Sequence, residues 1–212
     1  MTNVPQADGL NDTQGIGLKD LALATLAGAV AAATILVWGI PGLDPAMWSE
    51  AAVAAQIRPP QTIFPGFWRF VSVGLFSAFG VSGAIRVLTF AGAALGGISV
   101  ALVCLIVRQT LAFLVRTGRP YAVWSDRIAP FFAFVAAVLF GLSDPLSRIA
   151  RVLSPSLLRL AAVLLIVHLA LRWLAVGGRW RLFPCVALMG LLAAETPFGF
   201  LLPVLFIGAY VL

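Results

Sequence analysis

The sequence predicts an all-α membrane protein, a polytopic bundle of about five or six spanning helices. Hydrophobic residues make up 61% of the 212 residues, charged residues make up only 10%, and the mean hydropathy is +1.04. This composition excludes a soluble globular domain. A span needs roughly 20 apolar residues, so the length leaves no room for a separate soluble domain. We expect a polar N-terminal segment, residues 1–19, and one transmembrane domain, residues 20–212.

Four apolar runs are the clearest candidates for spans: residues 21–40, 87–107, 128–142 and 157–174. The third has only about 15 residues, so we expect it to be tilted or partly buried. A fifth run follows Arg181 and a sixth covers residues 198–212. The sequence ends inside this sixth run, which leaves truncation at the C-terminus open.

The first outer loop is the longest stretch without a span, and we expect interfacial helices in it. Asp44 precedes a proline, which is typical of a helix start, and the proline pair at residues 59–60 is typical of a stop. Residues 66–79 mix aromatic side chains with an arginine, which suits the boundary between water and lipid. Gly80 and Gly83 then permit a bend, so this segment is interpreted as interfacial or re-entrant.

A repeat of small residues in the second run predicts close helix packing. Gly92 and Gly96 have the small-xxx-small spacing, and Ala93 and Gly97 repeat that spacing one residue later. Small residues at this spacing allow two helix backbones to approach each other in a membrane.

An amphipathic turn is predicted after the third run. Ser143, Asp144 and Pro145 look like another helix start. Beyond them one face carries Leu146, Ile149, Val152 and Leu153, and the other carries Ser147, Arg148 and Arg151. We expect this turn to lie at the membrane surface.

The basic residues give a weak signal of orientation. With a cytoplasmic N-terminus, eight of the 14 Lys and Arg residues lie inside. The positive-inside rule therefore favours a multi-pass protein of the cell inner membrane with its N-terminus in the cytoplasm. In this orientation Asp44, Asp144 and Glu195 all belong to segments on the non-cytoplasmic side, where they could line one cavity.

Residue types and charge distribution disfavour several functions. The net charge of +6 is spread over many short polar stretches, so nucleic acid is not an expected partner. Cys104 and Cys185 lie in apolar runs and His168 is the single histidine, so neither a disulfide framework nor a thiolate metal site is indicated. No cofactor is certain, although a carboxylate such as Asp44 could hold a divalent metal ion against a phosphate.

The candidate site residues are six charged side chains on the non-cytoplasmic side: Asp44, Glu50, Arg58, Arg148, Arg151 and Glu195. Asp44 or Glu50 could act as a general base, and the arginines could bind a lipid phosphate through bidentate contacts. Plainer interpretations also apply, because an aspartate can simply cap a helix and arginines contact head groups at any interface. Glu195 is costly in lipid unless it faces a cavity or a helix break.

Several short motifs resemble one bacterial family of the GT-C type of membrane glycosyltransferases, related to transmembrane protein O-mannosyltransferases. Residues 48–55, WSEAAVAA, look like its acid-plus-alanine segment, and residues 64–67, FPGF, look like its Pro-Gly-aromatic segment. The later pieces LRW at 171–173 and MGLL at 189–192 occur in the same order. The resemblance covers roughly residues 20–212.

The resemblance implies a polyprenyl-phosphate sugar as donor and transfer with inversion to an acceptor on the outer side. Asp44 or Glu50 would deprotonate or position the acceptor. Met47 stands where the family usually has an aspartate, so Asp44 would have to substitute for it. The departing lipid phosphate would be stabilised by an arginine, which implicates Arg58, Arg148 or Arg151. The alternative is a non-catalytic membrane scaffold or lipid-binding subunit.

Overall fold

The secondary-structure elements of the described part of the chain are all α-helices, which confirms the all-α fold class. The computed structural model describes residues 17–38, 65–116, 122–151, 154–176 and 179–195. No strand occurs within these ranges. The helices are α1 (Leu18–Trp38), α3 (Pro65–Arg116), α4 (Ala122–Gly141), α5 (Asp144–Ala150), α6 (Pro155–Val176) and α7 (Arg179–Glu195).

Three helices in the described ranges are long and apolar enough to cross a membrane. These segments are Leu18–Val37, Gly83–Phe113 and Ser156–Ala175. They correspond to the first, second and fourth predicted runs. A fourth span results if Ile128–Gly141 and Asp144–Ala150, which meet at an angle of 62°, are counted as one broken span. The bundle is therefore multi-pass with three or four candidate spans.

The predicted count of five or six spans is not confirmed. The fifth apolar run forms α7, which has 17 residues and is therefore about 26 Å long at 1.5 Å per residue. A hydrocarbon core of about 30 Å requires slightly more. The sixth predicted run, residues 198–212, lies outside the described residues, and so do residues 1–16 of the predicted polar segment 1–19.

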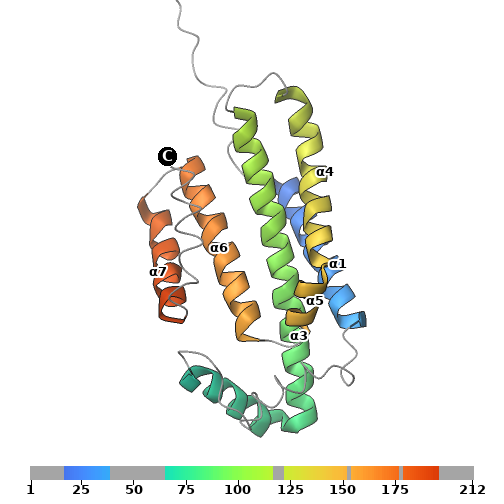
Figure 1. The fold of residues 1–212 in the computed structure, drawn as a ribbon, viewed down its shortest axis with the longest axis vertical. Helices are drawn as coiled ribbons and strands as arrows, with labels where there is room; N and C mark the ends of the chain where they lie inside the picture. The colour runs from blue at the N-terminus through green and yellow to red at the C-terminus, as the bar shows by residue number, and fades with distance from the viewer. Residues whose placement is uncertain (1–16, 39–64, 117–121, 152–153, 177–178, 196–212) are drawn as a thin grey trace, which may run out of the picture.

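Helix α3 is the central element of the bundle. It packs against α1, α4, α5 and α6, and α7 packs against α6 (Figure 1). The main core lies between α1, α3 and α4 and is made largely of alanines, among them Ala24, Ala27, Ala93, Ala133 and Ala137. A smaller core, built on Ile166 and Cys185, joins α6 to α7. Small core side chains let these helices lie close together, as expected where lipid rather than water surrounds a bundle.

The closest helix contact lies where α1 crosses α3. A Cβ added to Gly28 would lie 2.6 Å from the carbonyl oxygen of Gly97, and a Cβ added to Gly97 would lie 2.6 Å from that of Gly28. A Cβ on Gly96 would lie 2.9 Å from the side chains of both Ile35 and Ala150. The small-residue repeat in the second run thus forms a close helix contact, as its spacing predicts.

Gly80 divides α3 into two helical segments. Its φ of 66° and ψ of 179° lie outside the helical region, in a conformation that essentially only glycine adopts. Figure 1 shows that the part before Gly80 turns across the lower end of the bundle, whereas the part after it runs along the bundle. The bend expected from the sequence is therefore confirmed at this glycine.

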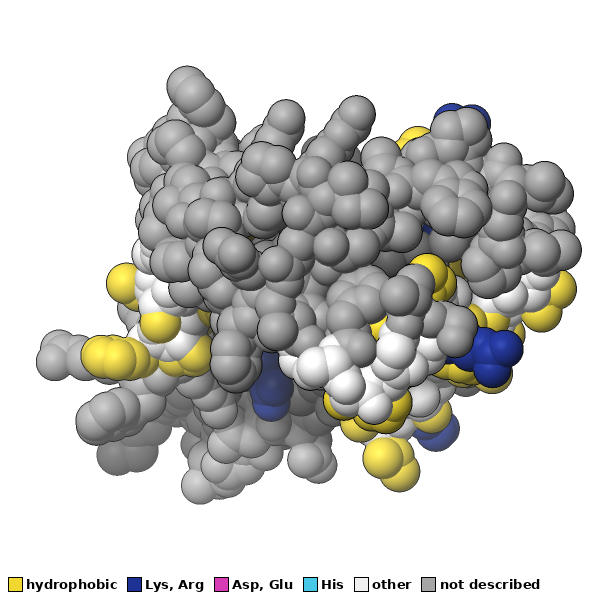
Figure 2. All heavy atoms as spheres, turned by 90° about the horizontal axis from the view of Figure 1, so that it is seen from below, with side chains coloured by type: hydrophobic (Ala, Val, Ile, Leu, Met, Phe, Trp, Pro, Cys, Tyr) yellow, Lys and Arg dark blue, Asp and Glu magenta, His cyan; other side chains and the backbone are white. Residues whose placement is uncertain are grey.

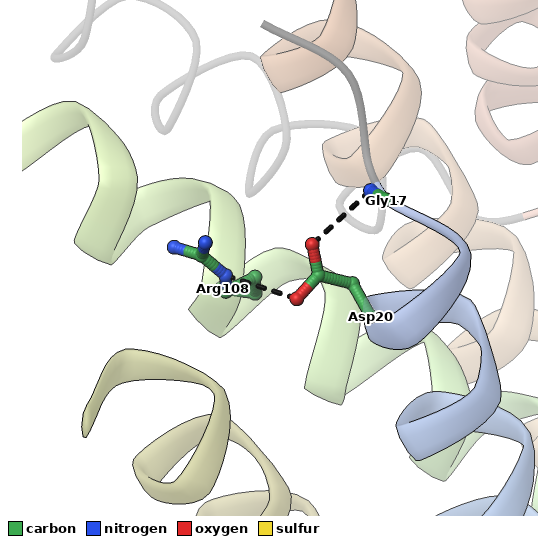
Figure 3. Close-up of polar contacts among 3 residues, drawn as sticks. All are labelled: Gly17, Asp20 and Arg108. Carbon is green, nitrogen blue, oxygen red and sulfur yellow. Dashed lines mark hydrogen bonds and ion pairs between the residues drawn. The ribbon is translucent and has the colours of Figure 1, made fainter. Parts of the chain in front are cut away.

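An ion pair joins the start of α1 to the far end of α3 (Figure 3). Arg108 Nε donates to Asp20 Oδ1 at 3.1 Å, and the two side chains are only 19% and 14% exposed. Asp20 Oδ2 accepts a second hydrogen bond from the backbone N–H of Gly17 at 3.2 Å, which caps the first turn of α1. Together with the glycine contact, this pair shows that α1 and α3 are antiparallel.

Candidate functional site

A pocket with both polar and apolar lining residues lies where α1, α4 and α5 meet, at the end of the bundle opposite the Asp20–Arg108 pair. Its volume is about 160 Å³. The lining residues are Thr34, Ile35, Gly141, Leu142, Asp144, Ser147 and Arg151. The volume is below the range of about 300–1,000 Å³ typical of sites for drug-sized ligands. The pocket therefore suits a small ligand, or a small part of a larger one.

The bend between α4 and α5 creates this pocket. Helix α4 ends at Gly141, where an added Cβ would lie 3.0 Å from the Cβ of Ala31, so α4 approaches α1 closely at this point. Ser143 then takes an extended conformation, with φ −67° and ψ 138°, and α5 starts in a new direction. The sequence prediction of a helix start at Ser143 and Asp144 is confirmed.

Helix α5 is amphipathic in the predicted sense. Leu146 and Ala150 are buried against the bundle, whereas Asp144 and Arg148 are exposed. Ser147 and Arg151 are intermediate in exposure and border the pocket. Figure 2 shows the bundle from this end, where apolar and basic side chains are visible between the grey residues.

The polar groups of the pocket come from two separate parts of the chain. Asp144, Ser147 and Arg151 follow one another at helical spacings of three and four residues, which places them on one side of α5 and its C-cap. Thr34 faces them from α1. The pocket thus combines one carboxylate, one guanidinium group and two hydroxyl groups.

A salt bridge on α5 partly neutralises the negative charge of Asp144. Arg148 Nε lies 2.8 Å from Asp144 Oδ2, and both side chains are about two-thirds exposed, at 66% and 67%. An exposed i,i+4 pair of this kind contributes only about 0.3–0.5 kcal/mol to stability. The two arginines and one aspartate leave this turn with a net positive charge.

The structure tests the placement of only some predicted site residues. Arg151 borders the pocket, whereas Arg148 is not in its lining and pairs with Asp144 instead. Glu195 is the last residue of α7, and its side chain lies outside the described residues. The remaining three candidates, Asp44, Glu50 and Arg58, also lie outside the described residues.

Sequence reasoning missed three of the pocket residues. Asp144 was predicted as a helix start in a turn that could line a cavity but not as a site residue, and Ser147 only as part of a polar face. Thr34 carried no signal because it lies within the first apolar run. The proline after Asp144 marks the bend, and a bend next to an arginine is the one local clue to a site here. Within the described ranges, no group of three or more metal-binding side chains is found.

Compared with known proteins, the chain matches no family model, no curated protein and no solved structure. The class of this protein is therefore inferred from its fold alone. In the part of the chain that the structure describes, three helices are long and apolar enough to span a bilayer, which indicates a multi-pass α-helical membrane protein. The pocket at the bend between α4 and α5 is its candidate binding site.

Proposed function

We propose that this membrane protein binds the phosphate group of a lipid in the α1–α4–α5 pocket. The observation that carries the proposal is Arg151 in the wall of a pocket at the end of the candidate spans. A guanidinium group offers five N–H donors in a planar fork that matches a phosphate. The net positive charge of the turn adds to the attraction.

The depth of the pocket supports a lipid ligand. Thr34 lies three residues before Val37, the end of the first candidate span, and so about 4.5 Å inside that end. The polar interfacial layer of a bilayer is about 5–7 Å thick on each side. Because this 20-residue span is about as long as the hydrocarbon core is thick, Thr34 lies just inside the edge of that core, next to the layer of lipid head groups.

The finer proposal is that the lipid is a polyprenyl-phosphate sugar and that the protein transfers the sugar. It rests on the sequence resemblance to GT-C glycosyltransferases. In this reaction Asp44 or Glu50 takes the proton of an acceptor hydroxyl, and the acceptor oxygen attacks the anomeric carbon. The bond from that carbon to the phosphate breaks with inversion, and Arg58, Arg148 or Arg151 stabilises the departing phosphate.

A binding experiment tests phosphate recognition. The purified chain is titrated in detergent with phosphatidylglycerol and with diacylglycerol, which lacks the phosphate, and bound lipid is counted by native mass spectrometry. Arg151→Gln should weaken binding of phosphatidylglycerol by about 10-fold to 150-fold, because a hydrogen bond to a charged group contributes about 1.5–3 kcal/mol. Arg86→Gln is the matched control, because Arg86 is exposed and does not line the pocket. Equal binding of both lipids would contradict the proposal.

A transfer assay tests the finer proposal separately. Membranes that contain the protein are given a radiolabelled polyprenyl-phosphate sugar, and labelled acceptor is measured. Alanine replacements of Asp44, Glu50 and Arg151 should each reduce transfer. Unchanged transfer in all three variants would show that this assignment is wrong.

The second candidate function is a non-catalytic lipid-binding subunit or scaffold. It is favoured by Met47, which stands where the resembled family usually has an aspartate. In this case the same pocket binds the lipid phosphate, but the protein catalyses no sugar transfer. Lipid binding that depends on Arg151, together with no sugar transfer by the unmodified protein, would support it.

A further inference from the structure

We infer that the ligand of the α1–α4–α5 pocket is a zwitterion, with a primary ammonium group among Thr34, Ser147 and Asp144 and a phosphate beside Arg151. Phosphoethanolamine, the head group of phosphatidylethanolamine, has this chemistry. The inference rests on the proposed phosphate binding and adds the second, cationic half of the ligand.

Both pocket hydroxyl groups have already used their only hydrogen-bond donor. Thr34 Oγ1 donates to the carbonyl oxygen of Val30 at 2.8 Å, and Ser147 Oγ donates to that of Asp144 at 2.9 Å. A hydroxyl group has one donor and two acceptor lone pairs. Toward a ligand, Thr34 and Ser147 therefore offer acceptors, and the phosphodiester of a lipid has no donor with which to use them.

Asp144 adds a charged acceptor to the same wall. Its Oδ2 accepts from Arg148 Nε at 2.8 Å. An ionised carboxylate has about four lone-pair sites on two oxygens, so one arginine contact leaves acceptor capacity. A ligand with only negative charge would be repelled by this carboxylate, whereas an ammonium group beside it would be stabilised.

The distance between the ammonium subsite and the phosphate subsite suits a ligand in which a short chain joins the two groups. Ser147 and Arg151 are four residues apart, which is about 6 Å along a helix axis. The two-carbon chain of ethanolamine separates an ammonium from a phosphate by a comparable length. The pocket volume of about 160 Å³ also favours a small head group over a bulky one.

Competition between lipids that share the phosphate tests the inference. Native mass spectrometry of the full chain compares phosphatidylethanolamine with phosphatidylglycerol, whose head group offers hydroxyl donors but no cation, and with phosphatidylcholine, whose cation has no N–H donor. We expect phosphatidylethanolamine to bind at least tenfold more tightly than either. Equal binding of the three lipids would contradict the inferred ammonium subsite but would remain consistent with phosphate binding. Failure to discriminate any of them from diacylglycerol would overturn the proposed function itself.

Variants separate the two halves of the site. Thr34→Val keeps the side-chain shape and removes an acceptor, so it should reduce the preference for phosphatidylethanolamine over phosphatidylglycerol. Thr25→Val is the matched control, because Thr25 also donates to the carbonyl oxygen four residues earlier on α1 but does not line the pocket. Asp144→Asn should reduce the same preference, whereas Arg151→Gln should weaken binding of every phospholipid. A preference unchanged in both Thr34→Val and Asp144→Asn would contradict the inference.

Soluble O-phosphoethanolamine distinguishes the source of the head group. If the ligand is a lipid, a large excess of the soluble compound should displace little phosphatidylethanolamine. Efficient displacement would support the zwitterionic site and assign it to a water-soluble ligand. Displacement by inorganic phosphate alone, equal to that by O-phosphoethanolamine, would argue against the ammonium subsite.

Discussion

Gly28 of α1 and Gly97 of α3 face each other so closely that a Cβ on either residue would lie 2.6 Å from the other's carbonyl oxygen. The clash would be with backbone, which no side-chain rotation can relieve. The contact therefore requires glycine on both helices and fixes how α1 crosses the central helix. Through α1 it also sets the position of Thr34, one wall of the pocket.

Gly97→Ala should destabilise the bundle by about 1–3 kcal/mol, the usual cost of overpacking a tight core. This loss outweighs the roughly 1 kcal/mol that alanine gains over glycine in a helix. Reversible unfolding in mixed micelles would measure the change. Gly190→Ala is the control, because nothing lies within 4 Å of an added Cβ there, and it should be neutral or stabilising. Equal effects of the two substitutions would contradict the close contact.

The Asp20–Arg108 pair should show a larger coupling energy than the exposed pair on α5. A double-mutant cycle with Asp20→Asn and Arg108→Met should give about 0.5–3 kcal/mol, since contacting and largely buried residues couple in this range. The same cycle on Asp144 and Arg148 should give about 0.3–0.5 kcal/mol. Raising the salt concentration should weaken the exposed pair more. A coupling near zero for the buried pair would refute this assignment.

Gly80→Ala should straighten α3, because an alanine strongly disfavours a φ of 66°. Spin labels at the exposed positions Gly74 and Ile98, in a variant without the native cysteines, report the bend. A straight helix would separate these positions by about 36 Å along its axis. Pulsed electron paramagnetic resonance should give a shorter distance with Gly80 and a distance closer to that limit with alanine. The same distance in both proteins would argue against a glycine-dependent bend.

Cysteine labelling should reveal the orientation in the membrane. Cys104 and Cys185 are buried, so the background from a membrane-impermeant maleimide should be low. Lys19 lies at one end of the bundle and Arg86 lies toward the other, and both are exposed. In intact spheroplasts Arg86→Cys should be labelled, whereas Lys19→Cys should be labelled only after permeabilisation. The reverse pattern would place the N-terminus outside.

The fold could be predicted where length and spacing alone decide the structure. Uninterrupted apolar runs located the candidate spans, and the small-xxx-small spacing that ends at Gly96 and Gly97 located a close contact. The number of spans could not be predicted in this way. Hydropathy does not show that α7, about 26 Å long, falls just short of a typical bilayer core.

The candidate site was harder to predict because its walls are far apart in the sequence. Arg151 could be singled out as a basic residue at a membrane surface. Thr34 belongs to an apolar helix more than 100 residues earlier, and only the packing of α1 against α4 brings it to the bend. Its hydroxyl group is also satisfied within its own helix, so nothing local marks it as a binding residue.

The separation of 88 residues between Asp20 and Arg108 has a consequence for biosynthesis. At about 5–20 residues per second, a ribosome needs roughly 4–18 s to make the intervening chain. During this interval α1 has been made but α3 has not. The Asp20 carboxylate therefore has no Arg108 to pair with at the boundary between water and lipid. Because Asp20 lies in the first turn of α1, it can remain hydrated at the boundary until α3 arrives. The order of synthesis thus favours an acidic residue at the end of this first helix rather than at its centre.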